Sequence, residues 1–514
     1  MGRVQNTLTV ASLLLCLSCQ AGIRAGPGET IVPGRQDLAT ESPATLSEKI
    51  ARDLVAVRDV IRGLSDLEER ARVATTAIEP SAPMPYTQAE NNRIRALLLS
   101  YLNYRSVLLR LLGYYSAYET IPREDLRLKS FLLAYVSGLT LYREGIVMVS
   151  MFRDRPRARA KLNEAEPIWG IPPDIFETVY RNITNPANVG LLGEARNYYA
   201  LQFPRMAKYR LTEGGELGWL HATIRRQQQF IEDNAVDIWR GQRDALLASL
   251  QGVSHGASYN ALTVMGLFAS NVKIQISRPY VTPAQVQELK GVLHPGDLIL
   301  EKRNWFVSNG FLPGFWPHMA LYVGSVKDLR DLGLTTHPLV RQHLEEYQQP
   351  DRSGRERRVI EAGATGVIFN SLEESLAADH VAVLRPRVSE ARKEAAIARA
   401  FSHYGKPYDF DFDFSTTDKL VCTELIYRVY DEPIRGESIQ FRLVQVLGRY
   451  TLPPQEVVDM FAQELALDMK REAFGLPPVR QLDFVLFLDA DPGSGTARPA
   501  GVEEFIRSAR RPAE

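Results

Sequence analysis

Cys422 is the residue of this sequence best suited to carry out chemistry. The chain has 514 residues and three cysteines, and Cys16 and Cys19 lie in an N-terminal segment with the character of an export signal. We therefore expect Cys422 to be the only free thiol of the mature protein, which excludes an intramolecular disulfide and a four-cysteine zinc site. Two interpretations remain open from this residue alone, a buried structural cysteine or a nucleophile.

A nucleophilic cysteine must be held as the thiolate and needs a base that carries protons. The pattern of apolar residues predicts a helix from Cys422 to Tyr430, and Thr417 or Asp418 is a candidate N-cap residue. This places the thiol near the first turn, where the partial positive charge of the helix dipole favours the thiolate.

His318 is the candidate base. It begins the segment HMALYVG, whose alternation predicts a strand that sends His318, Ala320 and Tyr322 to one face of a sheet. Glu361 lies at the end of a second predicted strand and could accept the other ring N–H, which would fix the tautomer. A simply solvated glutamate is the alternative interpretation.

Other polar residues are weaker candidates. His380 and His403 are reserve bases, and Glu424 is expected to serve the start of the cysteine helix rather than catalysis. Three aspartates alternate with phenylalanines just before the helix, at Asp409, Asp411 and Asp413. Carboxylates at a period of two form the polar face of an extended segment, so neither a metal nor another cofactor is predicted.

The elements that must position these residues form an α+β domain over about residues 285–490. Short β-rich runs separated by Gly and Pro predict strands at 297–303, 318–324, 358–363, 366–371, 380–386 and 483–489. Helices are predicted at 389–404, 422–430 and 455–470. The sheet thus comes first and the cysteine helix late. The tail, 491–514, is expected to be loose.

An all-helical domain is predicted at 46–270. Apparent capping boxes at Thr45-x-x-Glu48 and Thr87-x-x-Glu90 begin its first two helices, and further helical patterns follow up to 259–270. The apolar run 131–142 is flanked by charged residues and is too short for a membrane span, so a buried helix is predicted there. Nothing in this domain carries recognisable chemistry, and its role stays open.

The first 19 residues predict export. An apolar run from Leu8 to Leu17 has the length of a signal-peptide core and is too short to span a bilayer. The segment ending at Cys19 resembles a bacterial lipoprotein signal, although Cys16 stands where such signals usually carry Leu. Lipidation of Cys19, a flexible tether over 20–45 and an outer-membrane lipoprotein facing the periplasm of a Gram-negative bacterium are therefore expected. A plain cleaved signal peptide is the alternative.

The composition indicates a class of protein and excludes one kind of partner. Hydrophobic residues make up 45% and charged residues 24%, as in a globular protein with a real core. The net charge is +0, so no overall basic field exists to attract nucleic acid, and no such partner is predicted.

Five motifs together resemble a known family. They are GDLIL (296–300), HMALYVG (318–324), VIEAG (359–363), GKPYDFDF (405–412) and VCTELIYRVY (421–430). Their order is similar to that of the permuted papain-like cysteine hydrolases of the NlpC/P60 superfamily, in the group described as YiiX/YaeF-like amidases. In that group circular permutation places the histidine before the cysteine.

The resemblance implies a role for each site residue. Cys422 would be the nucleophile, His318 the general base and acid, and Glu361 the residue that orients the imidazole. Tyr408, in the Gly-x-Pro-Tyr motif, would contact the substrate or the oxyanion beside the Cys422 backbone N–H. Thr423 departs from the Ser that often follows the cysteine. Aromatic residues before His318 are possible substrate contacts, namely Trp305, Phe315 and Trp316.

The expected activity is therefore thiol-dependent hydrolysis of an amide or related acyl bond. The substrates that we expect are a peptide, with peptidoglycan as one candidate source, and a lipid amide or ester. Two alternatives remain, namely acyl transfer, as in the related lecithin:retinol acyltransferase group, and a non-catalytic envelope lipoprotein that binds a partner.

Overall fold

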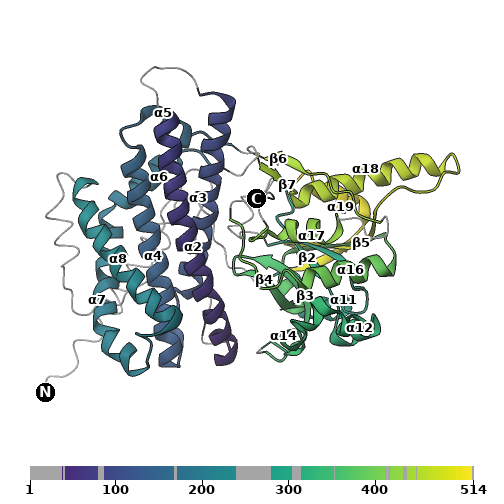
Figure 1. The fold of residues 1–514 in the computed structure, drawn as a ribbon, viewed down its shortest axis with the longest axis horizontal. Helices are drawn as coiled ribbons and strands as arrows, with labels where there is room; N and C mark the ends of the chain where they lie inside the picture. Colours follow the sequence, from purple (N-terminus) through teal and green to yellow (C-terminus); the bar gives the residue numbers. More distant parts are fainter. Residues whose placement is uncertain are drawn as a thin grey trace.

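The protein has a helical domain followed by an α+β domain, as predicted, and the two lie side by side in the computed structural model (Figure 1). The structure describes residues 38, 41–78, 86–166, 171–238, 279–303, 314–351, 353–410, 414, 417–431, 437–446 and 449–511. The predicted signal segment and the helix predicted at 259–270 lie outside these residues.

The helical domain is a bundle built around α4. Its elements are α2 (Pro43–Ile78), α3 (Gln88–Tyr115), η2 (Tyr118–Thr120), α4 (Glu124–Phe152), α5 (Pro156–Leu162), α6 (Ile175–Thr184), α7 (Pro186–Lys208) and α8 (Gly215–Ile238). Of the described helices, α4 is long and apolar enough to cross a membrane, but 89% of its apolar window is buried. It packs against α2, α3, α6, α7 and α8, which agrees with the prediction of a buried helix.

The two capping predictions have different outcomes. Thr87 and Glu90 form the predicted box, with the Glu90 N–H donating to Thr87 Oγ1 over 3.3 Å and the Thr87 N–H to Glu90 Oε2 over 2.7 Å. The box at Thr45 is wrong. Helix α2 begins earlier, at Pro43, because Ser42 Oγ accepts the Thr45 N–H (3.1 Å) and proline needs no partner in a first turn. The predicted tether therefore ends before residue 45.

The α+β domain contains a twisted antiparallel sheet. Within the described residues seven strands pair in the order β4-β3-β2-β1-β5-β8-β9. Their bounds are β1 (Leu298–Lys302), β2 (His318–Tyr322), β3 (Arg357–Gly363), β4 (Gly366–Ser371), β5 (His380–Pro386), β8 (Leu482–Asp491) and β9 (Thr496–Ala500). A separate hairpin consists of β6 (Val444–Val446) and β7 (Arg449–Thr451).

Helices cover both faces of this sheet. They are α11 (Pro283–Leu289), α12 (Val326–Asp331), η5 (Leu334–Thr336), α13 (Pro338–Arg341), α14 (Leu344–Gln348), α15 (Leu372–Ser375), α16 (Glu390–Phe401), α17 (Cys422–Tyr430), α18 (Pro454–Glu472) and α19 (Val502–Ser508). The cysteine helix α17 packs against β2 and β3, and α16 packs on α17. The strands that carry His318 and Glu361 thus support the helix that carries Cys422.

The alternation predicted for β2 is present. Met319 and Leu321 lie in the core shared with α17, while Ala320 and Tyr322 lie in the core on the other face. The GD turn before β1 fixes the far end of α17, because Tyr430 Oη donates to the Gly296 carbonyl over 2.8 Å. Asp297 of the same turn is 1% exposed and accepts both Arg385 Nε and Nη2, at 2.7 and 2.8 Å.

The prediction of a loose tail from residue 491 is wrong. Strand β9 pairs with β8, and α19 buries Phe505 completely. The Gly and Ser residues that suggested disorder form only the turn between the two strands. Apolar residues at helical spacing then dock α19 on the sheet, and Ser508 Oγ accepts the Trp316 indole N–H (2.9 Å).

Phe410 joins the two domains. Its ring is 4% exposed, belongs to the hydrophobic core of the helical domain, and lies 4.7 Å from the Tyr104 ring of α3. Its carbonyl accepts Asn103 Nδ2 over 3.1 Å. A second contact is the ion pair of Arg52 in α2 with Glu374 in α15, at 3.4 Å. Helices α2 and α3 thus form the side of the bundle nearest the α+β domain (Figure 1).

We expect Phe410→Ala to loosen this contact. Removing a buried phenylalanine ring costs about 3–5 kcal/mol in a core, so thermal unfolding should begin at a lower temperature and limited proteolysis should cut the chain near residue 410. The control is Phe474→Ala, because Phe474 is 81% exposed. Equal melting and cleavage of the two variants would show that Phe410 does not hold the domains together.

Candidate active site

Cys422 is the first residue of α17. Val421 is the N-cap residue, with φ −92° and ψ 167°, and no side chain caps the helix through it. The predicted caps Thr417 and Asp418 are wrong, because residues 417–419 form a bend and the chain then runs through the bridge residue Leu420 to the extended Val421. A short parallel bridge between Tyr408 and Leu420 holds it there, with the Leu420 N–H donating to the Pro407 carbonyl over 3.0 Å.

The thiol is therefore at the positive end of the helix. Cys422 is 1% exposed and is the free cysteine of the described part of the chain. Glu424, two residues on, is fully buried, accepts the Val421 N–H and pairs with Arg428, whose Nε lies 2.8 Å from Oε1. Burial raises the pKa of Glu424 to about 7 despite the Arg428 charge. Its contacts agree with the expected role at the helix start.

His318 and Glu361 meet across neighbouring strands. Nε2 of His318, the first residue of β2, lies 3.0 Å from Glu361 Oε2 on β3. The glutamate is held in turn, since Asn370 Nδ2 donates to Oε1 over 2.6 Å and Ser375 Oγ to Oε2 over 3.3 Å. The Glu361 side chain is 8% exposed, so this carboxylate is not simply solvated.

The imidazole also contacts the thiol. Cys422 is a hydrogen-bonding partner of His318, and Nδ1 is the ring nitrogen left for it because Nε2 faces Glu361. The His318 side chain keeps 25% of its surface exposed while Cys422 keeps 1%. A reagent would therefore approach the thiol from the imidazole side.

Charges around His318 favour its protonated form. Burial alone would lower the pKa of the imidazole, but the Cys422 charge, the hydrogen bonds to Cys422 and Glu361, and the Glu301 charge raise it well above its usual value. Burial would likewise raise the pKa of Glu361, yet the contacts with His318 and Asn370 lower it to about 2. Both shifts favour a charged pair of His318 and Glu361.

Glu301 is a site residue that the sequence analysis missed. It lies opposite His318 in the register of β1 and β2, and its Oε1 is 3.6 Å from His318 Nε2. Its side chain is 2% exposed, accepts Arg303 Nη2 over 3.2 Å, and is 3.4 Å from Ser375 Oγ. Burial raises the pKa of this carboxyl. The sequence could have indicated this residue, because antiparallel pairing of the two predicted strands brings Glu301 opposite His318.

Glu301, His318 and Glu361 also satisfy the distance rule for a metal site, with ligand atoms within 4.8 Å of one another. However, Arg303 and Asn370 already donate to the two carboxylates, and the imidazole faces the thiol. A divalent ion would have to displace a guanidinium contact and enter beside a fixed positive charge. This cluster fits a hydrogen-bonding network better than a metal centre.

Tyr408 lies near the thiol through its pairing with Leu420. Burial is the larger cause that raises the pKa of the Tyr408 phenol well above its usual value, and the Cys422 charge is the next. The hydroxyl therefore stays protonated. The Gly-x-Pro-Tyr segment is fixed against β4, since the Val367 N–H donates to the Lys406 carbonyl over 2.8 Å. Gly366 permits this approach, because a Cβ there would overlap the Lys406 carbonyl oxygen.

The predicted aromatic substrate contacts are corrected by the structure. Trp305 lies outside the described residues. Trp316 is fully buried between Phe487 and Phe505, and Phe315 is 4% exposed, with its ring 4.9 Å from that of His380. Both side chains pack in the interior because the segment before β2 runs under α19. They support the sheet and do not line a cleft.

The reserve bases His380 and His403 lie among residues with structural roles. His380 Nδ1 lies 2.8 Å from Asp489 Oδ1, in a pair that joins β5 to β8. Burial and three nearby cations lower the pKa of His403 to about 4, so this side chain is neutral. Asp409 is 3% exposed, while Asp411 and Asp413 lie outside the described residues.

An antiparallel sheet that supplies His and then Glu, with a later helix that presents Cys at its N-terminus, defines a permuted papain-like domain. The comparison with family models agrees. Residues 292–474, which make up most of the α+β domain, match the family described as permuted papain-like amidase enzyme, YaeF/YiiX, C92 family. This match supports a hydrolase. Searches of curated proteins and of solved structures gave no match.

Glu361→Gln should shift the pH dependence of thiol carboxymethylation by iodoacetate. This anionic reagent reacts best while the imidazolium is present. Because the substitution removes a charge that raises the pKa of His318, the fall in rate at high pH should move to lower pH, by about one unit or more. The rate is measured between pH 4 and 10.

Glu301→Gln is the matched control for this experiment. Glu301 is farther from the imidazole and its charge is partly balanced by Arg303, so the shift should have the same sign and be smaller. An unchanged high-pH limb in Glu361→Gln would mean that Glu361 does not control the protonation of His318.

Proposed function

We propose that this protein is a cell-envelope cysteine hydrolase that cleaves an amide or related acyl bond through Cys422, His318 and Glu361. One observation carries the proposal, namely that the His318 imidazole lies between the Cys422 thiol at a helix start and the Glu361 carboxylate at 3.0 Å. This is the order of contacts that nucleophilic catalysis by a cysteine requires.

In the first half of the proposed reaction, the Cys422 thiolate attacks the substrate carbonyl carbon. The carbonyl oxygen becomes an oxyanion that the Cys422 backbone N–H can stabilise, because the first N–H groups of a helix have no partner within it. The protonated His318 then gives its proton to the leaving amine or alcohol as the carbon–nitrogen or carbon–oxygen bond breaks. The acyl group remains on sulfur as a thioester.

In the second half, His318 is neutral and removes a proton from water. The resulting hydroxide attacks the thioester, the carbon–sulfur bond breaks, and the acyl group leaves as a carboxylic acid. Glu361 keeps the imidazole in one orientation throughout and stabilises its charged form. Tyr408, with a protonated phenol near the thiol, would donate to the oxyanion or to the substrate.

The substrate class follows from the expected location. An exported protein anchored through Cys19 would meet cell-wall peptides and the amides or esters of lipids. The sequence features that predict this location are the apolar run from Leu8 and the cysteine after it. Peptide or lipid substrates at the outer membrane are therefore part of this proposal.

The central test is the reactivity of Cys422 toward iodoacetamide at pH 6. The thiol should react at this pH, and His318→Ala should lower the rate by about 100-fold, because the imidazolium that stabilises the thiolate is lost. His343→Ala is the matched control, since this histidine lies between α13 and α14, where it pairs with Glu346 and its ring packs against Tyr404. An unchanged rate in His318→Ala would contradict the enzymatic proposal.

Acyl transfer is the alternative reaction. The 1% exposure of Cys422 favours it, because a shielded thioester can await an alcohol or amine acceptor. Purified protein would be incubated with peptidoglycan fragments and lipid amides, with and without an added acceptor, and the products identified by mass spectrometry. Free acid without acceptor supports hydrolysis, whereas acyl product only with acceptor supports transfer.

A further inference from the structure

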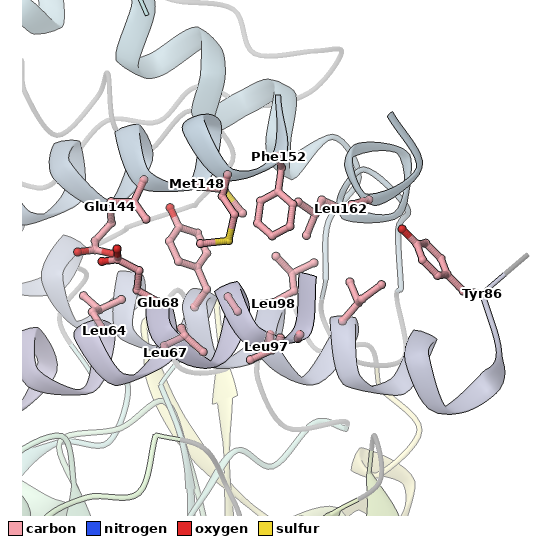
Figure 2. A pocket seen from close by; sticks show the side chains of 17 residues that line it. Leu64, Leu67, Glu68, Tyr86, Leu97, Leu98, Glu144, Met148, Phe152 and Leu162 are labelled. Carbon is pink, nitrogen blue, oxygen red and sulfur yellow. The ribbon is translucent and has the colours of Figure 1, made fainter. Parts of the chain in front are cut away.

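The helical domain contains an apolar pocket between α2, α3, α4 and α5 (Figure 2). Its volume is about 80 Å³, whereas small-molecule sites usually have roughly 300–1,000 Å³. Glu68 and Glu144 lie side by side at one end, and both pair with Arg143. The pocket is therefore too small for a ligand, and the charges at that end are balanced.

Exposed apolar side chains gather at a different place, the end of α18. Ten large apolar side chains are exposed in the described part of the chain, and five of them lie within residues 467–479, which we call the apolar tip. They are Leu467, Met469, Phe474, Leu476 and Val479, of which Phe474 is 81% and Met469 68% exposed. Single exposed apolar residues are ordinary, whereas a group of them marks an interaction surface.

The apolar tip projects from the α+β domain. The first half of α18 packs in the core through Val457, Val458 and Phe461. Beyond Phe461, Asp468 is the one residue of this helix that is buried. Figure 1 shows the end of α18 and the turn after it standing clear of the sheet, at the end of the molecule away from the helical domain. The tip is thus a narrow projection rather than a groove.

Polar groups hold the apolar tip in a defined shape. The Leu476 N–H donates to the Arg471 carbonyl over 3.0 Å, and Gly475 permits this helix ending with a φ of 68°. Asp468 accepts Arg480 Nη1 over 3.0 Å across the base of the turn. The turn is therefore ordered by its own polar groups, while its apolar side chains face solvent.

The charges of the apolar tip favour an anionic partner. Arg471 Nε donates to the Pro477 carbonyl over 2.8 Å, but neither Arg471 nor Lys470 forms an ion pair with a described residue. Glu472 is the acidic side chain beside them, since Asp468 is already paired within the turn. Two unpaired cations against one unpaired anion leave the tip with a small positive charge.

We propose that the apolar tip docks on the surface of a lipid bilayer that contains anionic phospholipid. Phe474 and Leu476 would enter the boundary between head groups and acyl chains, and Lys470 and Arg471 would meet the phosphates. A bilayer accepts a narrow apolar projection without a complementary groove, which a protein partner would have to provide. This inference does not depend on the reaction at Cys422.

Flotation of full-length Cys19→Ala protein with vesicles of phosphatidylglycerol and phosphatidylethanolamine tests the contact, because this substitution excludes a lipid anchor at Cys19. Phe474→Ser combined with Leu476→Ser should weaken binding about tenfold or more, since two apolar side chains no longer leave water. Val73→Ser combined with Leu201→Ser is the matched control and should bind like the parent, because these side chains are 62% and 72% exposed on the helical domain.

Absence of vesicle binding by the parent, or equal binding by the two double variants, overturns the proposal. Melting followed by circular dichroism should be the same for all of them, because every substituted side chain is exposed. Analytical ultracentrifugation identifies the other occupant. Self-association that is lost only in the tip variant, without vesicle binding by the parent, would mean that the tip joins two copies of the chain.

Phe474→Trp reports where the protein meets the bilayer. Vesicles with bromine-labelled acyl chains should quench the added tryptophan emission of this variant, because the side chain lies at the acyl boundary. Val73→Trp is the control and should show no added quenching. Equal quenching of the two variants would contradict docking through the apolar tip, as binding through the apolar run from Leu8 to Leu17 would not place residue 474 in the bilayer.

Lys470→Gln tests the preference for anionic lipid. It should weaken binding to phosphatidylglycerol vesicles about fivefold and leave binding to phosphatidylcholine vesicles unchanged, because only the anionic surface attracts the ammonium group. Lys208→Gln is the matched control, since Lys208 is an exposed lysine at the end of α7. An equal effect of Lys470→Gln on both kinds of vesicle would overturn the anionic preference.

Discussion

The site depends on one electrostatic arrangement, the His318 imidazole between the carboxylate of Glu361 and the thiol of Cys422. Burying the His318 imidazolium or the Glu361 carboxylate alone would destabilise the folded state, because a charge that leaves water without a counter-charge is strongly destabilised. Together they compensate one another, with the Glu361–His318 contact at 3.0 Å and further donors from Asn370 and Ser375. The surrounding strands can therefore keep these ionisable groups buried.

The sheet supplies the geometry that this arrangement needs. Neighbouring strands β1, β2, β3 and β4 contribute Glu301, His318, Glu361 and Asn370, so the register between strands sets each distance. The cysteine comes from a helix packed on the same strands, and its position is set by the bridge between Tyr408 and Leu420. The order of the histidine and the cysteine along the chain has little effect on the site, because strand pairing brings the two regions of the sequence together in either order.

Local patterns were sufficient to predict six of the described strands, namely β1 to β5 and β8, the helix that begins at Cys422, and the positions of His318 and Glu361 on strands. They failed where the outcome depended on neighbours distant in sequence. Thr417 and Asp418 look like caps, but the pairing of Leu420 delays the helix. Trp316 looks like a loop residue, but α19 covers it. Glu301 becomes a site residue only once β1 is placed beside β2.

The burial of Phe410 in the core of the helical domain limits how far the two domains can evolve separately. A residue of the α+β domain has become part of another domain's interior, and Tyr408 and Ala364 pack against the same core. The α+β domain on its own would present these apolar groups to water, and such a surface promotes association. The two domains are thus poorly suited to being exchanged or lost separately. Either event would require compensating changes around Phe410.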